Sequence, residues 1–292
     1  LSLLEKEIHK LQFGKVPAEL YDPITYILSL GGKKLRPLLA LLGYSIFKDD
    51  VDSVVKPALS IEVFHNFTLM HDDIMDKAPL RRGKATVHER WSENVAILSG
   101  DVMLVKAYDL LLDVDPVYLK IILQKFNQCA AEVCEGQQID MNFENRNGVT
   151  ESEYIDMIRL KTAVLLGFSL EMGAILAGAD VHNSQKLYEF GVYLGIGFQL
   201  MDDILDVYAN KEKFGKQVGG DIISNKKTFL LIKAKEKATG KDAKELEKWL
   251  EAKSFNHAEK VNAITGIYNR LEIRKEAEEK MNYYYSLAFA KL

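Results

Sequence analysis

The sequence predicts an all-α fold in which long helices pack together as a bundle. Only 6 prolines occur in 292 residues, so most of the chain is free of obligatory helix breaks. Apolar residues recur every three or four positions over long segments, which is the period of a helix. The sequence lacks a comparable alternation of apolar and polar residues bounded by turn pairs, which would predict strands.

The elements follow from these patterns in chain order. Three segments carry the helical period over twenty residues or so, and each is expected to be one long helix: 54–75, 154–175 and 187–207. Loops are predicted where Gly, Asn and charged residues gather: 31–32, 77–86, 145–150, 210–224 and 238–242. No Ser/Gly-rich or Pro-rich linker divides the chain, so a single domain over 1–292 is expected.

The most apolar segment, 162–179, is expected to be a buried central helix. It is about 18 residues long, which is marginal for a bilayer, and it has Glu171 near its middle. No membrane span is therefore expected.

The composition excludes other classes of protein. Hydrophobic residues make up 48% of the chain and charged residues 27%, which excludes a disordered or collagen-like chain. The net charge of -4 provides no field that would recruit nucleic acid, so no nucleic-acid partner is expected. The two cysteines, Cys129 and Cys134, cannot staple a chain of this length, which favours a reducing, cytoplasmic setting.

Two matching acidic motifs require an explanation that composition does not give. Each has the pattern Asp-Asp-x-x-Asp: the first runs from Asp72 to Asp76 and the second from Asp202 to Asp206. On a helix, the first and last aspartates of each motif are one turn apart and share a face. Like charges at this spacing repel one another unless a cation lies beside them. A hard divalent cation is the expected compensator.

Mg²⁺ suits these carboxylates better than Ca²⁺. It takes oxygen ligands, keeps several waters, and is typically held by one or two carboxylates together with the phosphate oxygens of a substrate. Neither motif has the glycine turn and spaced ligands of an EF-hand loop. A single copy would more often be a solvated helix end. Two copies on apolar helices, facing each other across a bundle, would bind a polyphosphate through bridging Mg²⁺.

Basic residues occur where a phosphate binder needs them. The segment 31–37 places three cations directly after a glycine pair, which favours anion binding. Arg81 and Arg82 follow the first acidic motif by five residues. Together they suggest two anion sites, one that binds through metal and one that binds through Arg and Lys directly.

With these residues assembled, the chain resembles the trans-isoprenyl diphosphate synthases, the polyprenyl synthetase family, from about residue 30 to about residue 231. The first aspartate motif of the family with its arginine pair is matched by 72–83, and the second by 197–206. The Gly-Gly-Lys-x-x-Arg-Pro element resembles 31–37, with Lys34 as an additional basic residue. The shorter family elements are matched at Lys161-Thr162, at Gly215, Lys216, Gly219, Asp221 and Lys226, and at Gly136, Gln137 and Asp140. A basic C-terminal tail that some members use over the homoallylic site is not evident.

The resemblance implies a role for each matched position. About three Mg²⁺ would bind the diphosphate of an allylic substrate through six aspartates: Asp72, Asp73, Asp76, Asp202, Asp203 and Asp206. Three basic side chains would contact that diphosphate directly: Arg81, Lys161 and Lys216. Isopentenyl diphosphate, the homoallylic substrate, would be bound by a second set: Lys33, Arg36, His65 and Arg82. Thr162 and Gln199 would line the reacting carbons, and Lys226 would close the site near the second motif.

The fold that the resemblance implies is the isoprenoid synthase type, an all-α bundle around a central cavity. The implied activity is that of a Mg-dependent prenyltransferase, which condenses isopentenyl diphosphate with an allylic diphosphate (dimethylallyl, geranyl or farnesyl) by ionisation, condensation and elimination. Such a reaction needs charge stabilisation at the leaving group and a dry cavity for the carbocation, and it needs no Ser/His/Asp nucleophile. The family usually forms homodimers, so a homodimer is expected.

The length of the product is expected to depend on the helix before the first aspartate motif. The growing chain would run from Asp72 toward the helix N-terminus, past Thr68 and Phe64, which lie one and two turns away at about 5.4 Å per turn. Phe67, five positions before the motif, is bulky, whereas Thr68 is small. In the resembling family a single aromatic at the fifth position is typical of the twenty-carbon geranylgeranyl product, which is expected here; the fifteen-carbon farnesyl product is the alternative.

Other classes of protein remain as alternatives. A terpene cyclase of the same fold also has an Asp-Asp-x-x-Asp motif, but its second metal motif is usually of Asn/Ser/Glu type and it needs no isopentenyl site. A non-catalytic subunit of a heteromeric synthase would be expected to lose one aspartate cluster. A metal-binding helical protein without a substrate leaves Arg81 and Arg82 unexplained.

Overall fold

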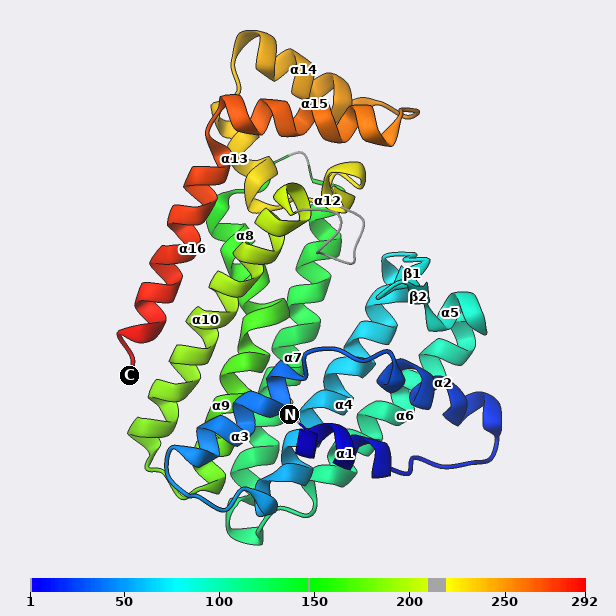
Figure 1. Cartoon of the computed structure of the whole chain (residues 1–292), viewed down its shortest axis with the longest axis vertical. Helices are drawn as coiled ribbons and strands as arrows, with labels where there is room; N and C mark the ends of the chain where they lie inside the picture. Colours follow the sequence, from blue (N-terminus) through cyan, green and yellow to red (C-terminus); the bar gives the residue numbers. More distant parts are fainter. Residues whose placement is uncertain (1, 147, 210–218) are drawn as a thin grey trace. The chain divides into compact units, whose positions relative to one another are not determined.

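A computed structural model describes residues 2–146, 148–209 and 219–292 (Figure 1). The fold is all-α, as predicted, and the described residues add one short hairpin of two strands. Contacts divide the chain into two compact units: unit 1 comprises Leu1–Gln128 and Leu165–Tyr188, and unit 2 comprises Cys129–Val164 and Glu189–Leu292. The single domain over 1–292 stays a prediction.

Unit 1 contains the N-terminal elements of the chain. They are α1 (Ser2–Lys10), α2 (Ala18–Ser29), α3 (Leu35–Ser45), α4 (Asp52–Met75), β1 (Leu80–Arg81), β2 (Lys84–Ala85), α5 (Val87–Arg90) and α6 (Glu93–Leu111), with the first part of α7 (Pro116–Glu144) and nearly all of α9 (Val164–Leu176). Helix α4 packs against α3 and α6, which buries it on most sides. The core contains Phe64 of α4, Phe126 of α7 and Phe168 of α9, whose rings contact one another with centroids 5.1 and 5.9 Å apart.

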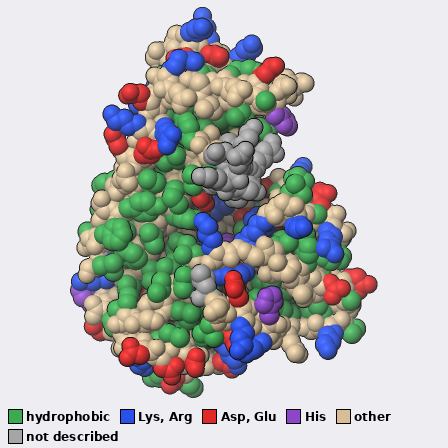
Figure 2. Space-filling view, viewed as in Figure 1, with side chains coloured by type: hydrophobic (Ala, Val, Ile, Leu, Met, Phe, Trp, Pro, Cys, Tyr) green, Lys and Arg blue, Asp and Glu red, His purple; other side chains and the backbone are tan. Residues whose placement is uncertain are grey.

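Unit 2 contains the remaining elements. They are the second part of α7, α8 (Glu151–Ile158), the π-helix η1 (Arg159–Ala163), most of α10 (Val181–Tyr208), α12 (Gly220–Ile223), α13 (Phe229–Lys237), α14 (Gly240–Glu251), α15 (His257–Arg270) and α16 (Ile273–Phe289). Helices α14 and α15 stack on each other at one end of this unit (Figure 1). Both basic and acidic side chains lie on the face of these helices that Figure 2 shows, as expected of a solvated pair of helices.

Two of the three long helices predicted from periodicity form as expected. Segment 54–75 lies within α4, and 187–207 lies within α10. The third, 154–175, contains the π-helix η1 between α8 and α9, which the apolar period did not reveal. A π-turn inserts a residue into the helical register and occurs frequently at functional sites. Helix α8 begins with a capping box, in which Thr150 and Glu153 bond each other's backbone N–H groups.

Three loop predictions need correction in detail. Segment 77–86 contains the strands β1 and β2. Each has two residues and is too short to show an alternation of apolar and polar residues. In 210–224, residues 220–223 form the single helical turn α12, and 210–218 lie outside the described residues. In 238–242, α14 already begins at Gly240.

The apolar segment 162–179 is buried from Ala163 to Ile175, as predicted, whereas Gly178 after α9 is exposed. Glu171 within the buried part is paired. Lys125 Nζ donates to Glu171 Oε1 over 2.5 Å, and both residues belong to unit 1. The Glu171 side chain is only 4% exposed, so the ion pair compensates its burial. Among the described residues, no helix combines the length and the apolar character needed to cross a bilayer.

Candidate active site

The first aspartate motif ends helix α4 in unit 1. Asp73 is buried, Asp72 is half-buried and Asp76 is exposed at the helix C-terminus. Two backbone hydrogen bonds hold the last turn of α4 and the residues that follow it. Asp76 N–H donates to Asp72 O over 2.8 Å, and Ala78 N–H donates to Asp73 O over 2.9 Å. The helix therefore presents Asp72 and Asp76 at its solvent-accessible end, one turn apart, as the spacing predicted.

Asp73 has a different environment, because it is bound by Arg81 of β1. The Arg81 guanidinium donates from Nε to Asp73 Oδ2 and from Nη2 to Asp73 Oδ1, each over 2.8 Å. Burial raises the pKa of Asp73, and this forked pair opposes that effect. An arginine has five N–H donors, so three N–H groups of Arg81 remain for an anion. Asp73 therefore orients Arg81. That Asp73 also binds a metal ion stays a prediction.

The glycine turn at 31–32 is fixed to the arginine pair and to α4. Arg82 donates from Nη1 to Gly31 O, which joins the β1–β2 turn to the loop before α3. Lys34, which has a left-handed backbone (φ 47°), is buried and donates from Nζ to Glu62 Oε1 over 3.0 Å. Lys33 is exposed. The additional Lys34 is therefore an anchor for the loop, and Lys33 is the lysine available to a ligand.

His65 and Arg36 lie together beside this loop. Arg36 Nη1 and His65 Nε2 are 3.1 Å apart. Burial, followed by the charges of Arg36, Arg81 and Arg82, lowers the pKa of His65 well below its usual value. A neutral His65 accepts the Arg36 N–H at Nε2, so the imidazole orients that guanidinium without repelling it. Unit 1 thus brings together the predicted isopentenyl-binding residues with the first aspartate motif.

The second aspartate motif, on α10 in unit 2, is built around a buried Asp203. Tyr154 of α8 donates its hydroxyl to Asp203 Oδ2, and Gln199 Nε2 donates to Asp203 Oδ1 over 3.1 Å. Burial and then the charge of Asp221 raise the pKa of Asp203 to about 7, against the lowering effect of these hydrogen bonds. The Thr162 hydroxyl in turn donates to Gln199 Oε1 over 3.2 Å. The amide of Gln199 is therefore fixed at both ends.

Helix η1 carries Lys161 and Thr162 into this network. Lys161 Nζ donates to Asp140 Oδ2 of α7 over 2.6 Å. Two glycines permit the close packing of the flanking helices: a Cβ on Gly136 of α7 would lie 2.2 Å from Lys161 N, and one on Gly195 of α10 would lie 2.6 Å from the Cα of Ala163. The backbones on both sides of η1 thus approach more closely than any other residue would allow.

Gly136→Ala is expected to displace η1. Because the added methyl group would meet backbone rather than a flexible side chain, we expect the free energy of unfolding to fall by about 1–3 kcal/mol. We also expect the catalytic rate to fall at least tenfold, since small displacements of positioned groups are costly. Denaturant unfolding and product assays measure both effects. Gly148→Ala is the matched control, because nothing lies within 4 Å of its Cβ position. Equal behaviour of the two variants would contradict this account of η1.

The last aspartate of the second motif anchors the segment that follows it. Asp206 Oδ2 accepts the Asp221 N–H over 3.1 Å, and its backbone carbonyl accepts the Gly219 N–H over 2.7 Å. The Lys226 N–H then donates to Asp221 O over 2.9 Å. Lys226 is thereby tied to the second motif within unit 2.

Comparison with known proteins shows the family to which the chain belongs. A model of the polyprenyl synthetase family matches residues 17–268. The chain belongs to the polyprenyl synthetase family. The geranylgeranyl diphosphate synthase of Methanosarcina mazei is 42% identical over 228 residues, which cover 77% of this chain and 70% of that protein.

Solved structures of the family have the same fold as this chain. A crystal structure of a geranylgeranyl pyrophosphate synthase superimposes with a TM-score of 0.95 at 43% identity, over 99% of this chain and 90% of that one. The geranylgeranyl pyrophosphate synthetase of Pyrococcus horikoshii gives a TM-score of 0.91 at 33% identity, over 99% and 88%. The resemblance inferred from the motifs and the isoprenoid synthase fold are therefore confirmed.

The two units of the chain divide the predicted site residues between them. Unit 1 holds Asp72, Asp73, Asp76, Lys33, Arg36, His65, Arg81, Arg82 and the chain-length residues Phe64, Phe67 and Thr68; unit 2 holds Lys161, Thr162, Gln199, Asp202, Asp203, Asp206 and Lys226. Lys216 lies outside the described residues. Two residues that the sequence did not single out have structural roles at the site: Glu62 and Tyr154. Lys34, noted in the sequence only as an additional basic residue, is the anchor of the glycine turn. Glu62 and Tyr154 belong to no matched motif. For Glu62, the one available sequence signal was the occurrence of an acidic residue within the apolar helical segment 54–75.

The carboxylates suit Mg²⁺ by their chemistry. Within the described ranges, no three His, Cys, Asp or Glu side chains come together as a group able to hold a metal ion. Asp72 and Asp76 offer hard oxygen atoms on one face without completing a coordination shell. This fits an ion that takes one or two carboxylates from the protein and the rest of its ligands from water and phosphate.

Proposed function

We propose that the chain is a short-chain trans-prenyltransferase that condenses isopentenyl diphosphate with an allylic diphosphate, and that its main product is geranylgeranyl diphosphate. The observation that carries this proposal is the pairing of two aspartate motifs with a separate basic cluster around His65 and Arg36. A terpene cyclase would not need that cluster. Several relatives, among them the Methanosarcina mazei protein, are named geranylgeranyl diphosphate synthases, which supports the same product.

Each cluster has a distinct part in the proposed reaction. We assign the allylic diphosphate to both aspartate motifs, with Arg81, Lys161, Lys216 and Lys226, and isopentenyl diphosphate to Lys33, Arg36, His65 and Arg82. Bound Mg²⁺, about three ions, would supply positive charge to the departing diphosphate. Arg81 contributes its three remaining N–H donors to the same anion, oriented by Asp73.

Thr162 and Gln199 have the task of protecting the carbocation. The Thr162 hydroxyl donates its hydrogen bond to Gln199, so the lone pairs of the Thr162 oxygen are available to a positive centre. Gln199 is also held at its other end by Asp203. The Gln199 amide is therefore prevented from rotating to bring a water molecule beside the carbocation. The double bond of isopentenyl diphosphate then attacks the cation, and the released diphosphate accepts the proton that is lost.

The assay of this proposal is direct. The chain is incubated with Mg²⁺, isopentenyl diphosphate and labelled dimethylallyl, geranyl or farnesyl diphosphate, and the products are dephosphorylated and sized. We expect twenty-carbon product and dependence on both Mg²⁺ and isopentenyl diphosphate. Cyclic products formed without isopentenyl diphosphate would indicate a cyclase, and fifteen-carbon product would indicate a farnesyl diphosphate synthase.

Phe67→Ala is expected to lengthen the product by one or more isoprene units. Phe67 is half-buried on α4, and its ring packs edge-on against His71 with centroids 4.7 Å apart, one turn before the first motif. Removing the ring opens the path toward Phe64, which is fully buried. Product sizing of Phe67→Ala beside Phe47→Ala, at an exposed phenylalanine after α3, tests this. An unchanged length distribution would place the chain-length limit elsewhere.

We further propose a cytoplasmic homodimer that associates through α6. Leu98, Val105 and Leu112 recur at seven-residue spacing along this helix and its end, and are 58%, 59% and 61% exposed. Side chains at this spacing share one face, and three exposed apolar residues on one face are typical of an interface.

Val105→Glu is expected to convert the dimer to a monomer, because it places a charge in the middle of that face. Sedimentation velocity measures the change. Val181→Glu, at a more exposed valine (87%) that begins α10, is expected to leave the mass unchanged. A dimer that survives Val105→Glu would exclude this face.

A further inference from the structure

Lys260 of α15 is a buried lysine to which the proposed function assigns no role. It has 0% exposure, and its ammonium donates to Asn225 Oδ1 over 2.6 Å and to Ile223 O over 3.3 Å. The ring of Phe255 lies 4.1 Å away as a cation–π partner. None of these partners is anionic, and burial lowers the pKa of Lys260. A buried ammonium is costly unless it is hydrogen-bonded, and here both bonds go to the turn 223–226.

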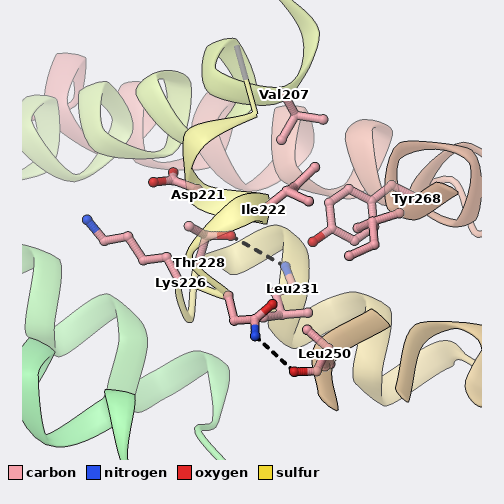
Figure 3. A pocket seen from close by; sticks show the side chains of 10 residues that line it. Val207, Asp221, Ile222, Lys226, Thr228, Leu231, Leu250 and Tyr268 are labelled. Carbon is pink, nitrogen blue, oxygen red and sulfur yellow. Dashed lines mark hydrogen bonds between the residues drawn. The ribbon is translucent and has the colours of Figure 1, made fainter. Parts of the chain in front are cut away.

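The turn 223–226 requires stabilising contacts, because its backbone includes a left-handed residue. Asn225 has a left-handed conformation, φ 56°, which asparagine tolerates better than most residues. Its side-chain amide donates to Leu250 O over 3.0 Å, one of the bonds drawn in Figure 3. The cavity beside the turn has a volume of about 10 Å³, which is room for about one water. Hydrogen bonds within the protein therefore fix the turn.

The turn presents Lys226. In Figure 3 the side chains of Asp221 and Lys226 project to one side, away from Val207, Leu231 and Tyr268, which form the apolar lining. At one end the segment is fastened to the second aspartate motif through Asp221 N–H and Asp206 Oδ2. At the other end it is fastened by Lys260. All these residues belong to unit 2.

We propose that Lys260 is a positioning residue that acts through Lys226: its ammonium fixes the turn 223–226 so that the Lys226 side chain is held ready for the diphosphate of the allylic substrate. The inference rests on the proposed function, since that function supplies the diphosphate. It extends the site to a helix, α15, that carries none of the matched motifs.

A double-mutant cycle tests this proposal. The full chain is titrated calorimetrically, in the presence of Mg²⁺, with the thiolo analogue of geranyl diphosphate, which binds without ionising. Lys226→Ala is expected to weaken binding by about tenfold, the effect of losing one charge-assisted contact. Lys260→Met should weaken it to a similar extent, and the double variant should bind no more weakly than Lys226→Ala alone. Losses that multiply in the double variant, or a folded Lys260→Met that binds within twofold of the parent chain, would overturn the proposal.

Two further variants guard the interpretation. Asn225→Gly keeps the left-handed backbone and removes the closer of the two acceptors of Lys260, so it should reproduce the loss even where Lys260→Met does not fold. Lys244→Met, at an exposed lysine of α14, should bind as the parent does. A normal affinity of folded Asn225→Gly would also count against the role of Lys260.

Kinetics separate a positioning role from general damage. Lys260→Met should raise the KM for the allylic substrate about tenfold and leave the KM for isopentenyl diphosphate within twofold, because the latter site lies in unit 1. Equal increases in both would overturn the proposal. If the parent chain binds the analogue and makes no product, the proposed function fails while the binding cycle still decides the role of Lys260. A parent chain that does not bind the analogue contradicts both.

Discussion

Asp72→Asn is expected to lower the rate of product formation by about 10²- to 10³-fold at saturating substrate. The exchange keeps the size of the side chain and removes one negative charge from the face that Asp72 shares with Asp76. Removing a single preorganised electrostatic group from a site where charge develops has effects of this size. Because Asp72 is half-buried at a helix end and contributes little to the core, the free energy of unfolding should change by less than about 0.5 kcal/mol.

The measurement is a steady-state assay across a range of Mg²⁺ concentrations. The loss in Asp72→Asn should be reduced at high Mg²⁺, since weaker binding of the ion is its cause. Asp49→Asn, at an exposed aspartate after α3, is the matched control and should retain the full rate. A variant at Asp72 that keeps more than a tenth of the parent rate would show that this carboxylate is not a metal ligand in the reaction.

Glu62→Ala is expected to lower the free energy of unfolding by about 3–5 kcal/mol. The side chains of Lys34 and Glu62 are both 5% exposed, and their ion pair is 3.0 Å long. Removing the carboxylate leaves the Lys34 ammonium buried without an anion, and it also removes an acceptor of Asn66 Nδ2. Denaturant unfolding should therefore show a large decrease in the midpoint.

An exposed ion pair supplies the control. Lys56 and Asp113 are 2.8 Å apart with side chains 65% and 54% exposed, so Asp113→Ala should cost less than about 1 kcal/mol. The double variant Lys34→Met/Glu62→Leu should recover much of the loss, because it removes both charges together. If Glu62→Ala were no more destabilising than Asp113→Ala, the buried pair would not be the anchor of the glycine turn.

The sequence predicted the parts of the fold and site that depend on the spacing of residues within one helix. Helices α4 and α10 follow from an apolar period, and Asp72 and Asp76 share a face because they are four positions apart. The matched motifs located both acidic clusters. Each of these inferences needs only the geometry of one helix.

The parts that the sequence did not reveal depend on contacts between distant segments. Tyr154 reaches Asp203 across 49 positions, and Lys260 reaches Asn225 across 35. The π-helix η1 depends on Gly136 and Gly195, which come from two other helices. A lysine next to the matched Lys33 gave no sign that it would be buried against Glu62. Such pairings are set by packing, which one sequence does not display.

The central proposal, which rests on the resemblance of both motifs to those of the family, is that both aspartate motifs bind one diphosphate through Mg²⁺. Calorimetric titration of the chain with the thiolo analogue of geranyl diphosphate, at saturating Mg²⁺, tests it most directly. We predict one Mg²⁺-dependent site per chain, which is lost in Asp72→Asn and lost equally in Asp202→Asn. Two separate sites per chain, with each variant losing only its own, would contradict the account.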